Sequence, residues 1–156
     1  MNIFRNYLVK NPVVLFGYNK PDTTQQVLKQ IKKVQPKKIY LVLDGAKSER
    51  EKNKCIETKK IFDNVNFDAE VIKIYSKKNL GLKKRWKSAL DEIFSKEESA
   101  IILEDDTLPS ISFFRFCDEL LEKYKYKKQI SQINGYNYFS KVSIKEDYYF
   151  TTYPEL

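Results

Sequence analysis

A short apolar run that ends in three acidic residues constrains the fold of this chain more than any other feature. Residues 100–103 show no polar alternation, which is typical of a strand covered on both faces. Glu104, Asp105 and Asp106 follow at once, and Pro109 prevents the strand from continuing. In open α/β sheets, ligands bind beyond the carboxyl ends of the strands. The run therefore predicts an α/β fold with acidic side chains at its ligand-binding edge.

These three carboxylates allow two interpretations. Like charges this close raise the pKa of one of them, and a divalent cation relieves the conflict. Hard oxygen ligands at a rigid strand end suit Mg²⁺ or Mn²⁺, usually alongside substrate phosphates. The alternative is a solvated loop in which Asp106 or Ser110 caps the next helix.

The remaining sequence alternates strand and helix patterns. Strands are expected at residues 13–16, 38–43, 69–75 and 100–103, with further short strands at 131–139 and 148–152; helices are expected at 23–34, from 48 to about 62, at 82–94 and at 110–124. The strand at 69–75 alternates in polarity, which favours a position nearer the sheet edge. This order predicts one wound domain, a mostly parallel sheet with helices on both faces.

Side-chain patterns refine three of the helices. Val27, Leu28, Ile31 and Val34 share one face of the first helix. Ser48 followed by Glu51 predicts a capping box at the start of the second. In the third, an i, i+4 stripe is assigned to the core, comprising Leu82, Trp86, Leu90 and Phe94.

Composition excludes several classes of protein. At 156 residues with 42% hydrophobic content, the chain is long and apolar enough for one folded domain. No apolar run approaches the roughly 20 residues that cross a bilayer, and the first ten residues lack a signal-peptide core. We expect a cytoplasmic protein, with peripheral contact to the inner membrane face left open. Cys55 and Cys117 are expected to be reduced, packed thiols.

The absence of histidine limits the available chemistry. Without an imidazole, acid–base steps must use carboxylates, Lys or Tyr. The formal net charge of +8 would attract phosphorylated ligands. It also permits an alternative function, a non-catalytic basic module for polyanions or nucleic acid, although no continuous basic stripe or aromatic stacking motif favours nucleic acid.

Four motifs together resemble the GT-A fold, the Rossmann-like nucleotide-sugar glycosyltransferases, most closely the N-acetylglucosaminyltransferase I type and its bacterial relatives. The resemblance covers roughly residues 11 to 153, and Glu104-Asp105-Asp106 is its most specific part. The other motifs are residues 13–22, Leu43-Asp44-Gly45 and Lys78-Asn79-Leu80-Gly81.

The resemblance implies a role for each motif. Asp106 would coordinate Mn²⁺ or Mg²⁺ bridging the diphosphate of a UDP-sugar, and Glu104 and Asp105 would lie against the sugar and ribose of this donor. Asp44 would contact uracil. Further donor contacts are expected from Phe16, Gly17, Tyr18, Asn19, Lys20, Asn79, Gly81 and Arg85. Lys20 stands where the family often has Arg, so its phosphate contact would lack the bidentate grip.

The family likeness implies an inverting transfer to a saccharide or lipid-linked saccharide acceptor. Such enzymes generally extend well beyond 156 residues, and the acceptor-binding half and catalytic base follow the acidic motif. The resemblance thus treats residues 1–156 as one donor-binding domain, its base expected beyond Leu156. An inactive glycosyltransferase remnant is the matching alternative.

Overall fold

A four-stranded parallel sheet forms the centre of the computed structural model, which describes residues 7–135 and 148–152. The sheet order is β3-β2-β1-β4, and every pair is parallel. The elements in chain order are β1 (Val13–Gly17), α1 (Pro21–Lys33), β2 (Lys38–Leu43), α2 (Glu49–Asp63), β3 (Glu70–Tyr75), α3 (Leu82–Phe94), β4 (Ile101–Glu104) and α4 (Ile111–Tyr124). The α/β prediction is confirmed.

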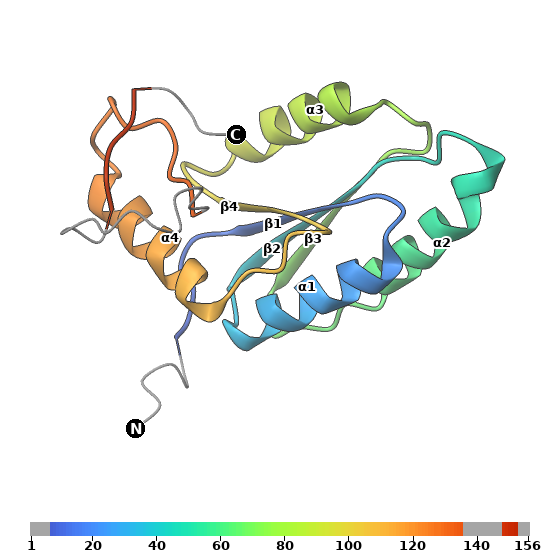
Figure 1. The fold of residues 1–156 in the computed structure, drawn as a ribbon, viewed down its shortest axis with the longest axis horizontal. Coiled ribbons are helices and arrows are strands. Elements are labelled where there is room, and N and C mark those ends of the chain that lie inside the picture. Colours follow the sequence, from blue (N-terminus) through green and yellow to red (C-terminus); the bar gives the residue numbers. More distant parts are fainter. Residues whose placement is uncertain (1–6, 136–147, 153–156) are drawn as a thin grey trace, which may run out of the picture.

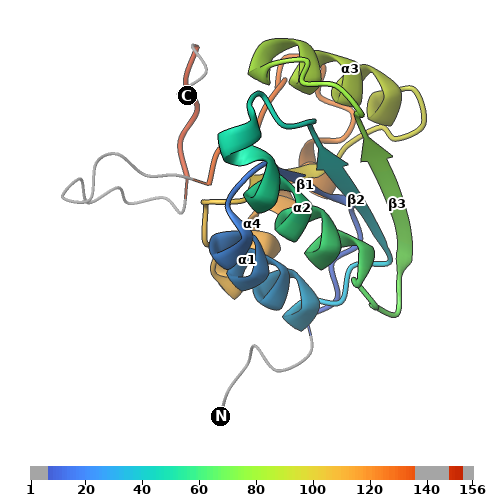
Figure 2. The same cartoon turned by 90° about the vertical axis from the view of Figure 1, so that its right-hand side faces the viewer.

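Helices cover both faces of the sheet, as predicted. α1 and α2 lie on one face and α3 on the other (Figure 1), and the view turned by 90° shows the same layers (Figure 2). The side chains of β1 alternate accordingly: Val13 and Leu15 pack with α1, α2 and α4, whereas Val14 and Phe16 pack with α3. The predicted apolar face of α1 is buried throughout.

Strand predictions held in the first two thirds of the chain and failed later. β3 is an edge strand, as its alternation indicated, and β4 lies at the other edge of the described sheet. Residues 148–152 are not a strand, because the aromatic rings of Tyr148 and Phe150 pack against Tyr124 of α4 instead of entering the sheet. Residues 131–135 are also not a strand, and the rest of that predicted strand, 136–139, lies outside the described residues.

The core stripe assigned to α3 was wrong at both ends. Leu82 is 74% exposed and Phe94 is 45% exposed, while the helix buries Arg85, Ala89 and Ile93. Leu82 belongs to the first turn, at the edge of the sheet, outside the apolar cluster that this helix covers. Successive i, i+4 steps rotate by about 40° around a helix, so Phe94 has turned away from the sheet by the last turn. Trp86 and Leu90 pack against the cluster as partly buried side chains.

The predicted capping box at α2 is also incorrect. Ser48 occupies the N-cap position but makes no side-chain cap to the helix backbone. Its hydroxyl instead donates to the Glu51 carboxylate at 3.1 Å. That carboxylate also accepts hydrogen bonds from the loop after β1, which compete for the oxygens that a capping box would use. At α4, by contrast, the Ser110 side chain does cap, accepting from the Phe113 N–H.

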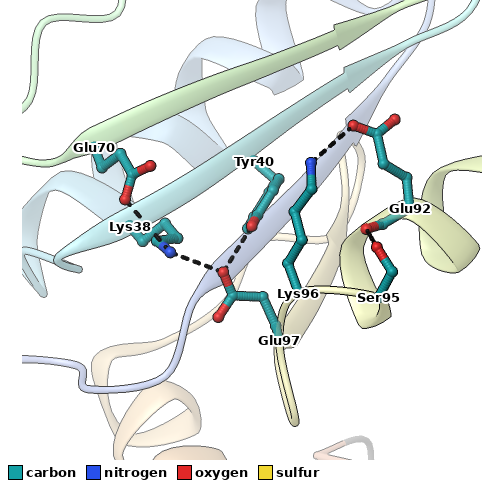
Figure 3. A network of polar contacts seen from close by, with 7 residues as sticks. All are labelled: Lys38, Tyr40, Glu70, Glu92, Ser95, Lys96 and Glu97. Atoms are coloured by element: carbon teal, nitrogen blue, oxygen red, sulfur yellow. Dashed lines mark hydrogen bonds and ion pairs between the residues drawn. The ribbon is translucent and has the colours of Figure 1, made fainter.

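A polar network joins the amino ends of β2 and β3 to the loop after α3 (Figure 3). The Glu97 carboxylate accepts from Lys38 Nζ at 2.9 Å and from the buried Tyr40 hydroxyl at 2.7 Å. Burial raises the pKa of Glu97, but these two hydrogen bonds outweigh it and hold the pKa below its ordinary value. Burial and Glu97 together raise the pKa of Tyr40 to about 12. The network ties α3 to the sheet at the end away from the predicted ligand site.

Replacing Glu97 by glutamine is expected to lower the free energy of unfolding by about 1 kcal/mol at neutral pH. A carboxyl with a depressed folded-state pKa contributes its full stabilisation above its unfolded-state pKa of about 4.3 and loses it as pH falls. Urea titrations at neutral pH and at about pH 3 should therefore show the difference shrinking in acid. The control is Glu92→Gln, which removes only the exposed pair with Lys96 and should change little at either pH. A difference in unfolding free energy between the native chain and Glu97→Gln that stays constant with pH would contradict this prediction.

Candidate functional site

The loops that follow the four strands meet at one edge of the sheet, here called the carboxyl edge. It comprises residues 18–20, 44–48, 76–81 and 105–110. Parallel register brings these loops together, since Phe16 pairs with both Val42 and Glu104. The order of strands and helices predicted that the four polar motifs would meet at one edge of the sheet, and they do.

Glu104, Asp105 and Asp106, here called the acidic trio, lie beside the loop after β1. Asp105 is 7% exposed, and its carboxylate accepts from the Tyr18 N–H at 2.8 Å. Asp106 is largely exposed and forms an ion pair with Lys20. Burial raises the pKa values of Glu104 and Asp105, and for Glu104 the two neighbouring carboxylates add to the effect. The hydrogen bond to Asp106 raises the pKa of Lys20. One lysine therefore faces three crowded carboxylates.

Asp44 holds the loop before α3 in place. Its carboxylate accepts from the backbone N–H groups of Gly45 at 2.9 Å, Leu80 at 3.0 Å and Gly81 at 3.0 Å. The Asn79 amide donates to the Gly45 carbonyl at 2.7 Å. A Cβ on Gly45 would lie 2.6 Å from the backbone carbonyl carbon of Lys78, so these two loops touch closely only because residue 45 is glycine. Asp44 and Asn79 are thus loop-anchoring residues in this structure.

Tyr18 connects the acidic trio to the loops on the other side of β1. Its backbone N–H contacts Asp105, while its hydroxyl donates to Glu51 Oε2 at 3.1 Å and accepts from the Lys47 N–H at 2.9 Å. The Asn19 amide donates to the other oxygen of Glu51 at 3.2 Å. Burial raises the pKa of Tyr18, with Glu51 adding to it. Sequence reasoning missed Glu51 at this site, because its spacing from Ser48 indicated a helix cap.

Two predicted donor contacts do not lie on the open side of the carboxyl edge. The Phe16 ring is buried and stacks on Trp86, with centroids 4.4 Å apart. Arg85 is 7% exposed, and its guanidinium donates to the Ile74 carbonyl at 2.5 Å on the α3 face. Its Nε is buried without a hydrogen-bond partner in the described part of the chain. Burial lowers the pKa of Arg85, although Asp44 opposes this. Gly17 is likewise used for packing, since a Cβ there would lie 2.7 Å from the Phe62 ring.

The acidic trio offers a partial cation site. Across residues 7–135 and 148–152, no group of three or more His, Cys, Asp or Glu side chains is arranged to hold a metal ion. Asp105 accepts from the Tyr18 N–H and Asp106 is paired with Lys20, so within the described chain Glu104 is the member of the trio whose carboxylate has no partner. Mg²⁺ is commonly bound by one or two carboxylates with substrate phosphates and water completing the shell. The residues present fit a cation that arrives with a phosphorylated ligand.

The described surface also has a hollow beside α1, to which the carboxyl edge contributes Leu108. Its volume is about 440 Å³, and it lies along the outer side of α1. It is lined by Gln26, Lys29, Gln30, Lys32, Lys33 and Leu108. None of the predicted site residues takes part in it.

No protein-family model, curated protein or solved structure matches this chain. In the residues that the structure describes, no helix has both the length and the apolar character needed to span a bilayer. The functional assignment therefore depends on the motifs and on the geometry of the carboxyl edge.

Proposed function

We propose that this chain binds a nucleotide-diphosphate sugar together with a divalent cation at the carboxyl edge, as the donor-binding part of a glycosyltransferase. The observation that carries the proposal is the pairing of Lys20 with Asp106 beside two further carboxylates of raised pKa. Such a site holds one positive and several negative groups within reach of the same ligand. The lysine can pair with a diphosphate and the carboxylates can bind a cation.

Lys20 and Asp106 would exchange partners when the ligand binds. Both side chains are substantially exposed, 49% and 42%, so neither is held by burial. Lys20 would turn to a phosphate oxygen as a point charge. Asp106 would turn to the cation, with Glu104 beside it. When bound, the cation would stabilise the negative charge of the departing diphosphate.

The other side of the edge would receive the nucleoside. Tyr18 and Asn19 form its floor, held by Glu51, and the loop at residues 79–81 forms its wall, held by Asp44. All the oxygens of these two carboxylates accept hydrogen bonds within the protein. Recognition of the base would therefore come from the backbone of these loops more than from the Asp44 side chain, a revision of the role that the resemblance implies.

Calorimetric titration with UDP-sugars in the presence of Mn²⁺ tests this proposal. We expect metal-dependent binding by the native sequence and a loss of at least about tenfold in affinity for Asp106→Ala, since a charged ligand contact contributes about 1.5–3 kcal/mol. Asp91→Ala is the matched control, because Asp91 is also an exposed acid paired with a lysine, Lys87 on α3. This control should bind like the native chain. Metal-independent binding, or equal affinity of the Asp106 variant, would contradict the proposal.

A further inference from the structure

A second feature of the carboxyl edge is a long stretch without acidic residues, here called the basic segment, residues 76–90. It contains six basic residues and no Asp or Glu. Arg85 is buried and Lys87 pairs with Asp91, which leaves Lys77, Lys78, Lys83 and Lys84. All four are exposed, and within the described chain their ammonium groups make no hydrogen bond or ion pair. The segment therefore presents unneutralised positive charge.

Exposed leucines lie between these lysines. Leu80 is 39% exposed and Leu82 is 74% exposed, the latter one of the most exposed large apolar side chains described. They flank Gly81, whose φ of +76° is suited to glycine and turns the chain into α3. Asp44 fixes this turn through the N–H groups of Leu80 and Gly81. A buried carboxylate thus holds the backbone of Leu80 and of the residue that precedes Leu82.

The combination of free lysines with exposed leucines favours an anionic membrane over a nucleic acid as the partner of this surface. A nucleic acid would pair with the lysines but would leave Leu82 without a function. A single-stranded nucleic acid would also call for an aromatic ring on which bases stack, and the nearby Trp86 ring is already stacked on Phe16. An anionic bilayer accepts both groups, because lysines meet headgroup phosphates while leucines enter the acyl boundary.

We propose that the basic segment docks the protein on an anionic lipid surface, with Leu80 and Leu82 inserted and the four free lysines against the headgroups. α3 runs from this segment toward the opposite end of the sheet, so its first turn, with Leu82, stands at the carboxyl edge (Figure 1). Docking in this way would set the carboxyl edge beside the membrane plane. The inference requires neither nucleotide nor cation and so stands apart from the proposed donor site.

Co-sedimentation of the full chain with vesicles tests the proposal. Vesicles of phosphatidylcholine alone are compared with vesicles of equal parts phosphatidylcholine and phosphatidylglycerol, at low and high salt and without nucleotide or metal. Binding is expected only to the anionic vesicles and should weaken with salt. One lysine near such a surface raises the partition coefficient onto anionic vesicles about fivefold. Replacing Lys77, Lys78, Lys83 and Lys84 by glutamine should therefore lower this coefficient by several hundredfold. Leu82→Ser should cost about tenfold.

A second quadruple variant separates the surface from the overall charge. Lys29, Lys32, Lys33 and Lys60 are exposed on α1 and α2, and their replacement by glutamine removes the same net charge. This control should retain most of the binding. Equal losses in both quadruple variants, or no binding to anionic vesicles, would overturn the proposal. So would tight binding of a labelled DNA duplex that is insensitive to Leu82→Ser, which would assign the surface to nucleic acid.

Discussion

Replacing Asp118 by alanine is expected to lower the free energy of unfolding by about 3–4 kcal/mol. Asp118 lies in α4 and is 1% exposed. Its carboxylate accepts from the Tyr7 hydroxyl at 2.7 Å, from the Asn11 N–H and side-chain amide at 2.8 Å each, and from the Lys10 N–H at 3.1 Å. The substitution leaves the two buried Asn11 donors without an acceptor, which is the costly case. The segment leading into β1 would detach from α4.

The neighbouring acid provides the control for this measurement. Glu119 is exposed and forms an i, i+4 pair with Arg115, so Glu119→Ala should change stability by no more than about 0.5 kcal/mol. Urea unfolding can be followed by the fluorescence of Trp86, the single tryptophan, which is stacked on Phe16 and reports on the sheet. A loss below about 1 kcal/mol for Asp118→Ala, the size of one ordinary hydrogen bond, would contradict this account.

Replacing Asp44 by alanine is expected to lower the free energy of unfolding by about 2–3 kcal/mol, because three backbone N–H groups lose a charged acceptor. The effect should be local as well as global. Hydrogen exchange of the Leu80 and Gly81 amides should accelerate more than that of β1, since these amides depend on Asp44 directly. The loop that forms one wall of the proposed nucleoside site would then be loosened.

Asp68→Ala is the matched control for Asp44, because Asp68 is exposed and its carboxylate has no hydrogen bond or ion pair within the described chain. This variant should leave both stability and exchange unchanged. If Asp44→Ala weakened nucleotide binding without accelerating exchange at residues 80 and 81, Asp44 would act as a ligand contact. The role implied by the family resemblance would then be supported over the anchoring role.

The sequence predicted the helices and the first four strands well because their signals are local. Apolar periodicity and the proline at the first position of α1 are readable from neighbouring residues. The predictions failed where the position of a side chain depends on residues that are distant in the sequence. Leu82 fits a core stripe by spacing, yet the position of α3 over the sheet leaves it exposed. Tyr148 and Phe150 have strand-like neighbours, yet their rings pack on α4.

What the sequence determined by itself was the kind of fold and the edge where its polar motifs gather, since the alternation of strands and helices along the chain follows from local patterns and parallel crossovers share one handedness. Only the tertiary structure decided how each polar group is used. Asp44 anchors a loop some 36 residues away, Glu51 supports Tyr18, and Arg85 is buried beneath the edge. The physical reason is that a buried carboxylate or guanidinium takes whichever partners the fold brings within hydrogen-bond distance, and sequence spacing carries no information about those partners.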